Sequence, residues 1–118
     1  MNVIKFLFKK IANISKVFSR KGLNKFISTE VSQLNNRQYK ALTVGAGGDT
    51  ESLIKVNKNI NLISIDINTH KKPDILMDIN NLSFEENSFD IVFIFEVLEH
   101  LPNPQNAIDQ IYKILKPS

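Results

Sequence analysis

A run of small residues and a later aspartate stand at a spacing that suits a nucleotide cofactor. The run is Gly45-Ala46-Gly47-Gly48. Its missing side chains let the backbone turn sharply and let a ligand lie against the amides that open a helix. Asp66 follows 21 positions after Gly45, and its carboxylate could accept both hydroxyls of a ribose. Alone, the run could be an ordinary tight turn and Asp66 a helix cap, so the prediction of a cofactor site depends on the pair.

Two further groups of residues could contact the same ligand. Asp78 and Ile79 can offer a carboxylate to an exocyclic amine and an apolar side chain to the face of a purine. Glu96, Glu99 and His100 directly follow the most apolar segment of the chain, where the reactive end of a bound donor would lie. A loop aspartate is usually only solvated, and His100 could simply pair with Glu96 or Glu99. Each group alone is weak evidence for a ligand site, and the prediction depends on their occurring together.

The segments between these residues predict alternating strands and helices. Short apolar runs that indicate strands lie at 41–44, 61–66, 74–77 and 89–95. Segment 89–95 is the most apolar of them and is expected to be central. Helices are expected from Asp49-Thr50, which could cap the first one, to Val56, and again from Pro104. This alternation predicts an α/β fold with a parallel sheet, whose ligands bind at the carboxyl ends of the strands.

The last helix has an apolar stripe at helical spacing. We expect it to face the sheet through Ala107, Ile108, Ile111, Tyr112 and Leu115.

The two ends of the chain differ in charge. Residues 1–40 carry nine basic side chains and one acidic side chain, whereas residues 41–118 carry six basic and eleven acidic ones. The basicity therefore belongs to an N-terminal arm, predicted over 1–38, and the folded domain is expected over 39–118. A basic arm on an acidic domain does not indicate a nucleic-acid-binding fold, and no nucleic-acid partner is expected.

The arm has apolar residues at three- and four-residue steps up to Phe18, with lysines on the other side of the predicted helix. Three interpretations stay open: a helix covering one face of the sheet, a helix lying on a membrane surface through residues 1–21, and a signal peptide. The signal peptide is the least favoured, because Lys9 and Lys10 interrupt the apolar run. The absence of cysteine is compatible with the reducing cytoplasm. We expect a cytoplasmic protein, with peripheral membrane contact as the alternative.

Residues 41–118 resemble the S-adenosylmethionine-binding region of the type 11 class of methyltransferases over nearly their whole length. The run from Val44 to Gly48 is similar to the glycine motif of that family, and the segment ending at Asp66 is similar to its ribose-binding strand. Asp78 and Ile79 resemble its adenine-contacting pair. Residues 82–90 are similar to the pattern L-P-F-x-D-x-S-F-D, residues 96–104 to E-V-L-E-H-x-x-D-P, and residues 116–117 to the start of L-K-P-G-G.

The resemblance implies a Rossmann-like sheet of order 3-2-1-4 with flanking helices, S-adenosylmethionine as cofactor, and a methyl acceptor that is a small molecule or a sugar- or lipid-linked intermediate. It implies cofactor contacts by Val44, Gly45, Ala46, Gly47, Asp66, Ile67, Asp78, Ile79 and Glu96. His100 is the candidate base if the acceptor must lose a proton. Glu96, Glu99 and His100 also resemble a metal-binding element of some methyltransferases, but no metal ligand is assigned here.

The chain departs from the family pattern at three places. Thr43 stands where the family usually has an acidic residue, Asp49 stands where it has a third glycine, and the sequence stops at Ser118 before the fifth strand and an antiparallel pair. These departures support an alternative, a non-catalytic remnant or interaction module that keeps the fold. Dinucleotide binding is less favoured, because the pattern G-x-G-x-x-G begun at Gly45 would need glycine where Thr50 stands.

Overall fold

The computed structural model describes residues 32, 34, 37–94 and 97–117. The predictions for the arm, including its apolar stripe and its membrane contact through residues 1–21, lie outside these residues and stay predictions. Of the predicted arm, Leu34 is described, and it packs against core residues of the sheet that follows. The first strand begins at Tyr39, where the domain is expected to begin.

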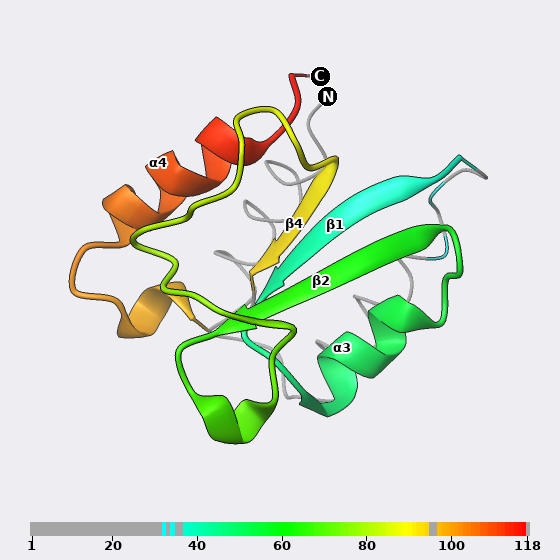
Figure 1. Cartoon of the computed structure of the whole chain (residues 1–118), viewed down its shortest axis with the longest axis horizontal. Helices are drawn as coiled ribbons and strands as arrows, with labels where there is room; N and C mark the ends of the chain where they lie inside the picture. The colour runs from blue at the N-terminus through cyan, green and yellow to red at the C-terminus, as the bar shows by residue number, and fades with distance from the viewer. Residues whose placement is uncertain (1–31, 33, 35–36, 95–96, 118) are drawn as a thin grey trace.

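Four parallel strands form one sheet in the order β3-β2-β1-β4 (Figure 1). The strands are β1 (Tyr39–Val44), β2 (Ile60–Asp66), β3 (Ile75–Leu76) and β4 (Ile91–Ile94). In the register, Val44 lies opposite Ile65 on one side and opposite Ile94 on the other. The carboxyl ends of the three long strands therefore lie together, and the order 3-2-1-4 confirms the predicted Rossmann-like fold.

Segment 89–95 was expected to be central, and among the four described strands β4 stands at the end of the order, beside β1. In the part of the chain that the structure describes, β4 pairs with β1 alone, apart from an isolated bridge between Phe89 and Leu115. The strand is apolar because both of its faces are covered: Ile91 and Phe93 pack into one core cluster, and the alternate residues of the strand pack into the other. The high apolarity of this strand therefore reflects the burial of both of its faces.

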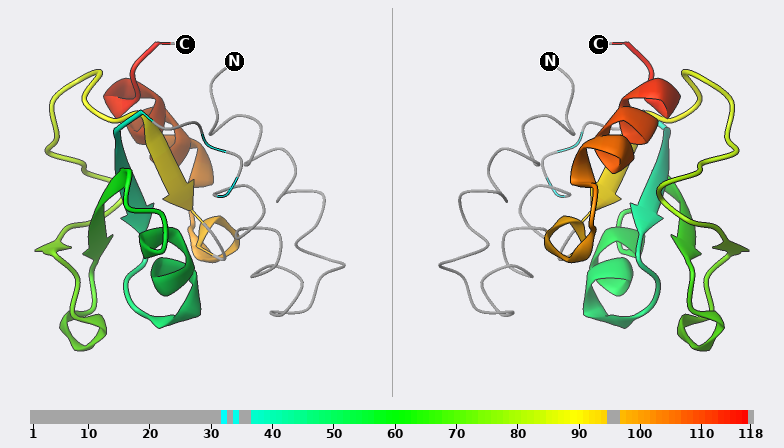
Figure 2. Two further views of the ribbon diagram at one scale, coloured as in Figure 1. Left: turned by 90° about the vertical axis from the view of Figure 1, so that its right-hand side faces the viewer. Right: turned by 90° about the vertical axis from the view of Figure 1, so that its left-hand side faces the viewer.

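Helices cover both faces of the sheet. They are α3 (Gly48–Lys55) and α4 (Pro104–Ile114), and two short 3₁₀ turns follow β2 and β4, η1 (Thr69–Lys71) and η2 (Leu98–His100). Side chains of successive strand residues point to opposite faces. Leu42 accordingly packs in the cluster that contains Ile111 of α4, while Ala41 packs in the cluster that contains Ile54 of α3. Figures 1 and 2 show α4 near β4 and α3 near β2.

Two local expectations about the helices need correction. Asp49 does not cap α3, because the helix already begins at Gly48, with Gly47 as its N-cap. Tyr112 does not face the sheet: it is 45% exposed, whereas Ile111 and Ile114 are buried. Since each helical residue advances about 100° around the axis, the position after Ile111 falls off the buried stripe. Pro104 does stand in the first turn of α4, as expected.

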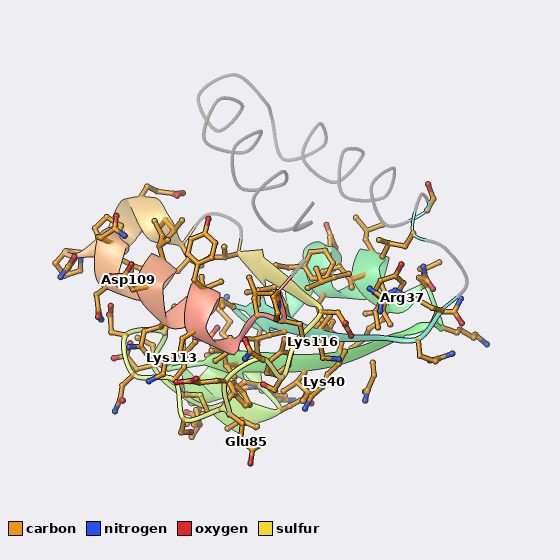
Figure 3. The ribbon with its side chains drawn as sticks, turned by 90° about the horizontal axis from the view of Figure 1, so that it is seen from above. Arg37, Lys40, Glu85, Asp109, Lys113 and Lys116 are labelled. Atoms are coloured by element: carbon orange, nitrogen blue, oxygen red, sulfur yellow. The ribbon has the colours of Figure 1, made fainter. Side chains whose placement is uncertain are left out.

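Asp90 joins three segments at the amino ends of the strands, far along the sheet from the glycine turn. Its Oδ2 accepts a hydrogen bond from the Lys40 amide at 2.8 Å, and its Oδ1 lies 3.4 Å from Arg37 Nη1 and 3.4 Å from Lys116 Nζ. Figure 3 labels these three basic residues. Burial by itself would raise the pKa of Asp90, but the Lys40 amide and the charges of Lys116 and Arg37 outweigh it and hold that pKa below its ordinary value.

Replacing Asp90 with asparagine should lower the free energy of unfolding by about 1–2 kcal/mol near neutral pH, because a hydrogen bond to a charged, nearly buried acceptor is weakened. The folded pKa is depressed, so this contribution is complete above the unfolded pKa of about 4 and is lost as the pH falls through the folded pKa. Urea unfolding near neutral pH and in more acidic buffer should show the gap between wild type and Asp90→Asn closing. Asp109→Asn, on the exposed face of α4, is the control. A gap that is the same in acid would contradict the assignment.

Candidate cofactor site

A pocket opens at the carboxyl ends of the strands. It encloses about 440 Å³, including space that is open to solvent. All four strands or the segments that follow them contribute to its lining: Val44, Gly45, Ile65, Asp66, Ile67, Met77, Asp78, Ile79, Val97 and Leu101. The walls are mostly apolar, and among the described residues Asp66 and Asp78 supply the charged groups. This arrangement suits a ligand with an apolar ring system and a few polar groups.

The glycine turn between β1 and α3 has a backbone that only glycine adopts without strain. Gly47 has φ 77° and ψ −179°, a region that other residues essentially do not occupy. A Cβ atom there would also lie 3.4 Å from the Lys71 carbonyl oxygen. Gly45 has φ 96° and approaches the side chain of Val97, in the segment after β4. A Cβ atom at Gly45 would lie 3.8 Å from Val97 Cγ2, an ordinary contact, so the turn requires glycine through its backbone conformation.

Asp66 fastens this turn to the end of β2. Its Oδ2 accepts a hydrogen bond from the Ala46 amide at 2.9 Å, and its Oδ1 accepts one from the Asn68 amide at 2.9 Å. A carboxylate has about four lone-pair sites, so each oxygen can still accept a second hydrogen bond. Asp66 is thus held in place by the backbone and keeps the capacity to bind a ribose diol.

The segment after β3 is held by the other helix. Asp78 Oδ1 accepts a hydrogen bond from the Asn80 amide at 2.9 Å. Asn106 Nδ2 of α4 donates to the Asn80 carbonyl oxygen at 3.1 Å, and Gln110 Oε1 accepts from the Leu82 amide at 3.0 Å. Helix α4 therefore fixes the loop that carries Asp78. Sequence reasoning missed this support, although Asn106 and Gln110 stand one helical turn apart beside the apolar stripe of α4.

The pocket brings together most of the residues that the sequence assigned to the cofactor. Six of them line it: Val44, Gly45, Asp66, Ile67, Asp78 and Ile79. Ala46 and Gly47 lie in the adjoining turn, and Glu96 lies outside the described residues. The sequence did not indicate four other lining residues, Ile65, Met77, Val97 and Leu101. The individual roles of these residues toward a cofactor stay predictions.

His100 is not among the residues that line the pocket. It stands in η2 with its side chain 77% exposed, and its Nε2 lies 3.9 Å from Glu99 Oε1. The two side chains are therefore neighbours beyond hydrogen-bond distance, and Glu96, the other partner that the sequence suggested, lies outside the described residues. Within residues 37–94 and 97–117, no group of three or more histidine, cysteine, aspartate or glutamate side chains is placed to hold a metal ion.

The comparison with protein families decides the assignment. A profile described as a methyltransferase domain, of the type 11 class, matches residues 41–118, about two thirds of the chain. The chain belongs to this methyltransferase family. S-adenosylmethionine is the cofactor of the family, and the residues present fit it: apolar walls suit a purine, and the two carboxylates suit hydroxyl and amine donors.

Relatives and solved structures agree with this family. The chain is 29% identical over 93 residues to cycloartenol-C-24-methyltransferase of Arabidopsis thaliana, covering 79% of this chain and 23% of that protein. A putative S-adenosylmethionine-dependent methyltransferase of Methanococcus maripaludis superposes with a TM-score of 0.70 at 16% identity, over 92% of this chain and 57% of the other. A putative sarcosine dimethylglycine methyltransferase of Galdieria sulphuraria gives a TM-score of 0.69 at 18% identity, over 83% and 44%.

The methyltransferase domain thus spans less than a quarter of the length of that plant relative and about half the length of the structural neighbours. In the part of the chain that the structure describes, every helix is too short or too polar to cross a lipid bilayer.

Proposed function

We propose that this methyltransferase domain binds S-adenosylmethionine in the pocket at the carboxyl ends of its strands and supports methyl transfer to a small molecule or a sugar- or lipid-linked acceptor. The observation that carries the proposal is Asp66, whose two oxygens are positioned by the amides of Ala46 and Asn68 at the rim of an apolar pocket. A carboxylate held in this way recognises a ribose diol without having to reorganise when the ligand arrives.

The bound cofactor would supply a methyl group on a positively charged sulfur, ready for in-line displacement. The chain contributes mainly orientation to such a reaction. Ile65 and Ile79 provide apolar walls that exclude water from one side of the pocket, and Asp78 can accept from an amine at the outer end. His100 remains the candidate base, and its side chain is 77% exposed beside Glu99.

Isothermal titration calorimetry with S-adenosylhomocysteine tests the cofactor claim directly. We expect saturable binding well below millimolar ligand, because the pocket combines apolar burial with charge-assisted hydrogen bonds. Nicotinamide adenine dinucleotide is the matched control ligand, since it shares the adenosine but adds a pyrophosphate. The absence of heat at millimolar S-adenosylhomocysteine would overturn the proposal.

The alternative is a domain that keeps the fold without turning over a substrate. It is favoured by Thr43, which is 3% exposed and is not among the residues that line the pocket, so no acidic side chain enters the pocket from that position. A turnover assay distinguishes an active methyltransferase domain from an inactive one. A domain that binds S-adenosylhomocysteine but releases no demethylated cofactor with a broad panel of acceptors would be an interaction module.

A further inference from the structure

Three successive amide donors of the glycine turn are occupied by protein groups. The Gly45 amide donates to the Ile65 carbonyl oxygen at 2.9 Å, and the Ala46 amide donates to Asp66 Oδ2 at 2.9 Å. The Gly47 amide donates to Glu51 Oε2 at 2.8 Å. Two of these three acceptors are carboxylates, so the turn presents negative charge where an open helix terminus would present free amides.

The position of Glu51 favours its hydrogen bond with the Gly47 amide. Glu51 lies in α3, four residues after Gly47, and its side chain is 15% exposed. Its other oxygen, Oε1, lies 3.6 Å from Lys55 Nζ one turn along the helix. The carboxylate therefore bridges the N-cap residue and a lysine of the same helix, which holds it against the turn.

Free amides at the amino end of a helix, together with the helix dipole, form a ready site for phosphate. A phosphate that used the Gly47 amide would have to displace Glu51 and would then face a second carboxylate, that of Asp66. We infer that Glu51 is a specificity-determining residue, which closes the glycine turn to phosphorylated adenine nucleotides and so reserves the pocket for an adenosine ligand without phosphate. This inference rests on the proposed function, because it assumes that the pocket receives adenosine.

The same geometry predicts a gain of phosphate affinity when Glu51 is removed. Glu51→Ala frees the Gly47 amide, removes one negative charge and removes the Glu51 carboxylate from beside Lys55. All three changes favour the binding of phosphate. We expect the ratio of ADP affinity to adenosine affinity, measured by calorimetry on the full chain, to rise about ten-fold, the worth of a hydrogen bond to a charged group. Glu51→Gln keeps an acceptor for Gly47 but loses the charge, so the ratio should rise by about three-fold.

Glu85→Ala removes the same charge from an exposed site near the other end of the sheet and should leave the ratio unchanged. Melting curves of the variants show whether each one is folded, and Glu51→Gln gives the answer if Glu51→Ala is not. An unchanged ratio in both Glu51 variants would overturn the inference.

Failure of the proposed cofactor binding can be distinguished from failure of the role assigned to Glu51. If the wild-type chain bound neither adenosine nor S-adenosylhomocysteine, the cofactor claim would fall, yet the role of Glu51 could still be measured. Pyrophosphate titrated against the nitrogen-15-labelled chain should shift the Gly47 amide resonance in Glu51→Ala and not in wild type. Equal shifts in the two proteins would reject the role assigned to Glu51.

Discussion

Asp66→Ala should weaken the binding of S-adenosylhomocysteine about 100-fold, a loss of about 2.7 kcal/mol. The variant removes the acceptor for the ribose hydroxyls and also releases the amides of Ala46 and Asn68, which both donate to this carboxylate at 2.9 Å. Hydrogen bonds to a charged acceptor contribute about 1.5–3 kcal/mol each, so the loss of the ribose contacts alone is large enough. Calorimetry on the variant and on wild type measures the effect.

A second variant and a second ligand separate recognition of the ribose from support of the turn. Asp66→Asn keeps one oxygen that can accept from the Ala46 amide, and it should bind S-adenosylhomocysteine with intermediate affinity. Adenine has no ribose, so its weaker binding should change little in Asp66→Asn. An equal loss for adenine would mean that Asp66 acts only by supporting the turn, and unchanged binding of S-adenosylhomocysteine by Asp66→Ala would reject the assigned site.

The second large effect is expected for Gly47→Ala. Its φ of 77° and ψ of −179° are available essentially only to glycine, and an alanine held there would cost about 1–3 kcal/mol. The added Cβ atom would lie 3.4 Å from the Lys71 carbonyl oxygen, at the close limit of ordinary contact, so the cost comes mainly from the backbone conformation. We expect a melting temperature lower by roughly 5–15 °C and affinity for S-adenosylhomocysteine lower by about ten-fold or more, because the turn must move.

Ser52→Ala is the matched control for Gly47→Ala. Its hydroxyl donates to the Gly48 carbonyl oxygen at 3.2 Å on the exposed side of α3, so its loss should change the melting temperature by only a degree or two. Differential scanning fluorimetry with and without ligand measures both quantities. If Gly47→Ala melted and bound like wild type, the backbone described for the turn could not be the one that binds the cofactor.

Much of the fold could be predicted from the residues alone because its determinants are local. A glycine run after a short apolar segment predicts a strand and a turn, and Pro104 near an apolar stripe predicts the start of a helix. The family resemblance supplied the place of β4 in the order 3-2-1-4, which the apolarity of segment 89–95 by itself did not indicate. Apolarity reports how much of a strand is covered, whereas its place in the sheet depends on which strands pair with it.

Part of the candidate site could likewise be predicted from the sequence, and part could not. Six of the nine residues assigned to the cofactor line the pocket, because the carboxyl ends of parallel strands meet at one edge and the sequence shows where each strand ends. Glu51 could not be recognised beforehand, since an acidic residue in the first turns of a helix is common and its bond to Gly47 depends on the shape of the turn.

The residue pattern was enough to identify the glycine turn, the acidic residue 21 positions later and the parallel arrangement that places both at one edge of the sheet. The contacts that those groups make depend on the folded chain. Asp66 reaches the Ala46 amide across 20 positions of chain, and Asp90 reaches Arg37 across 53. Such contacts form because folding brings distant segments together, and no local periodicity records which side chain will meet which backbone amide.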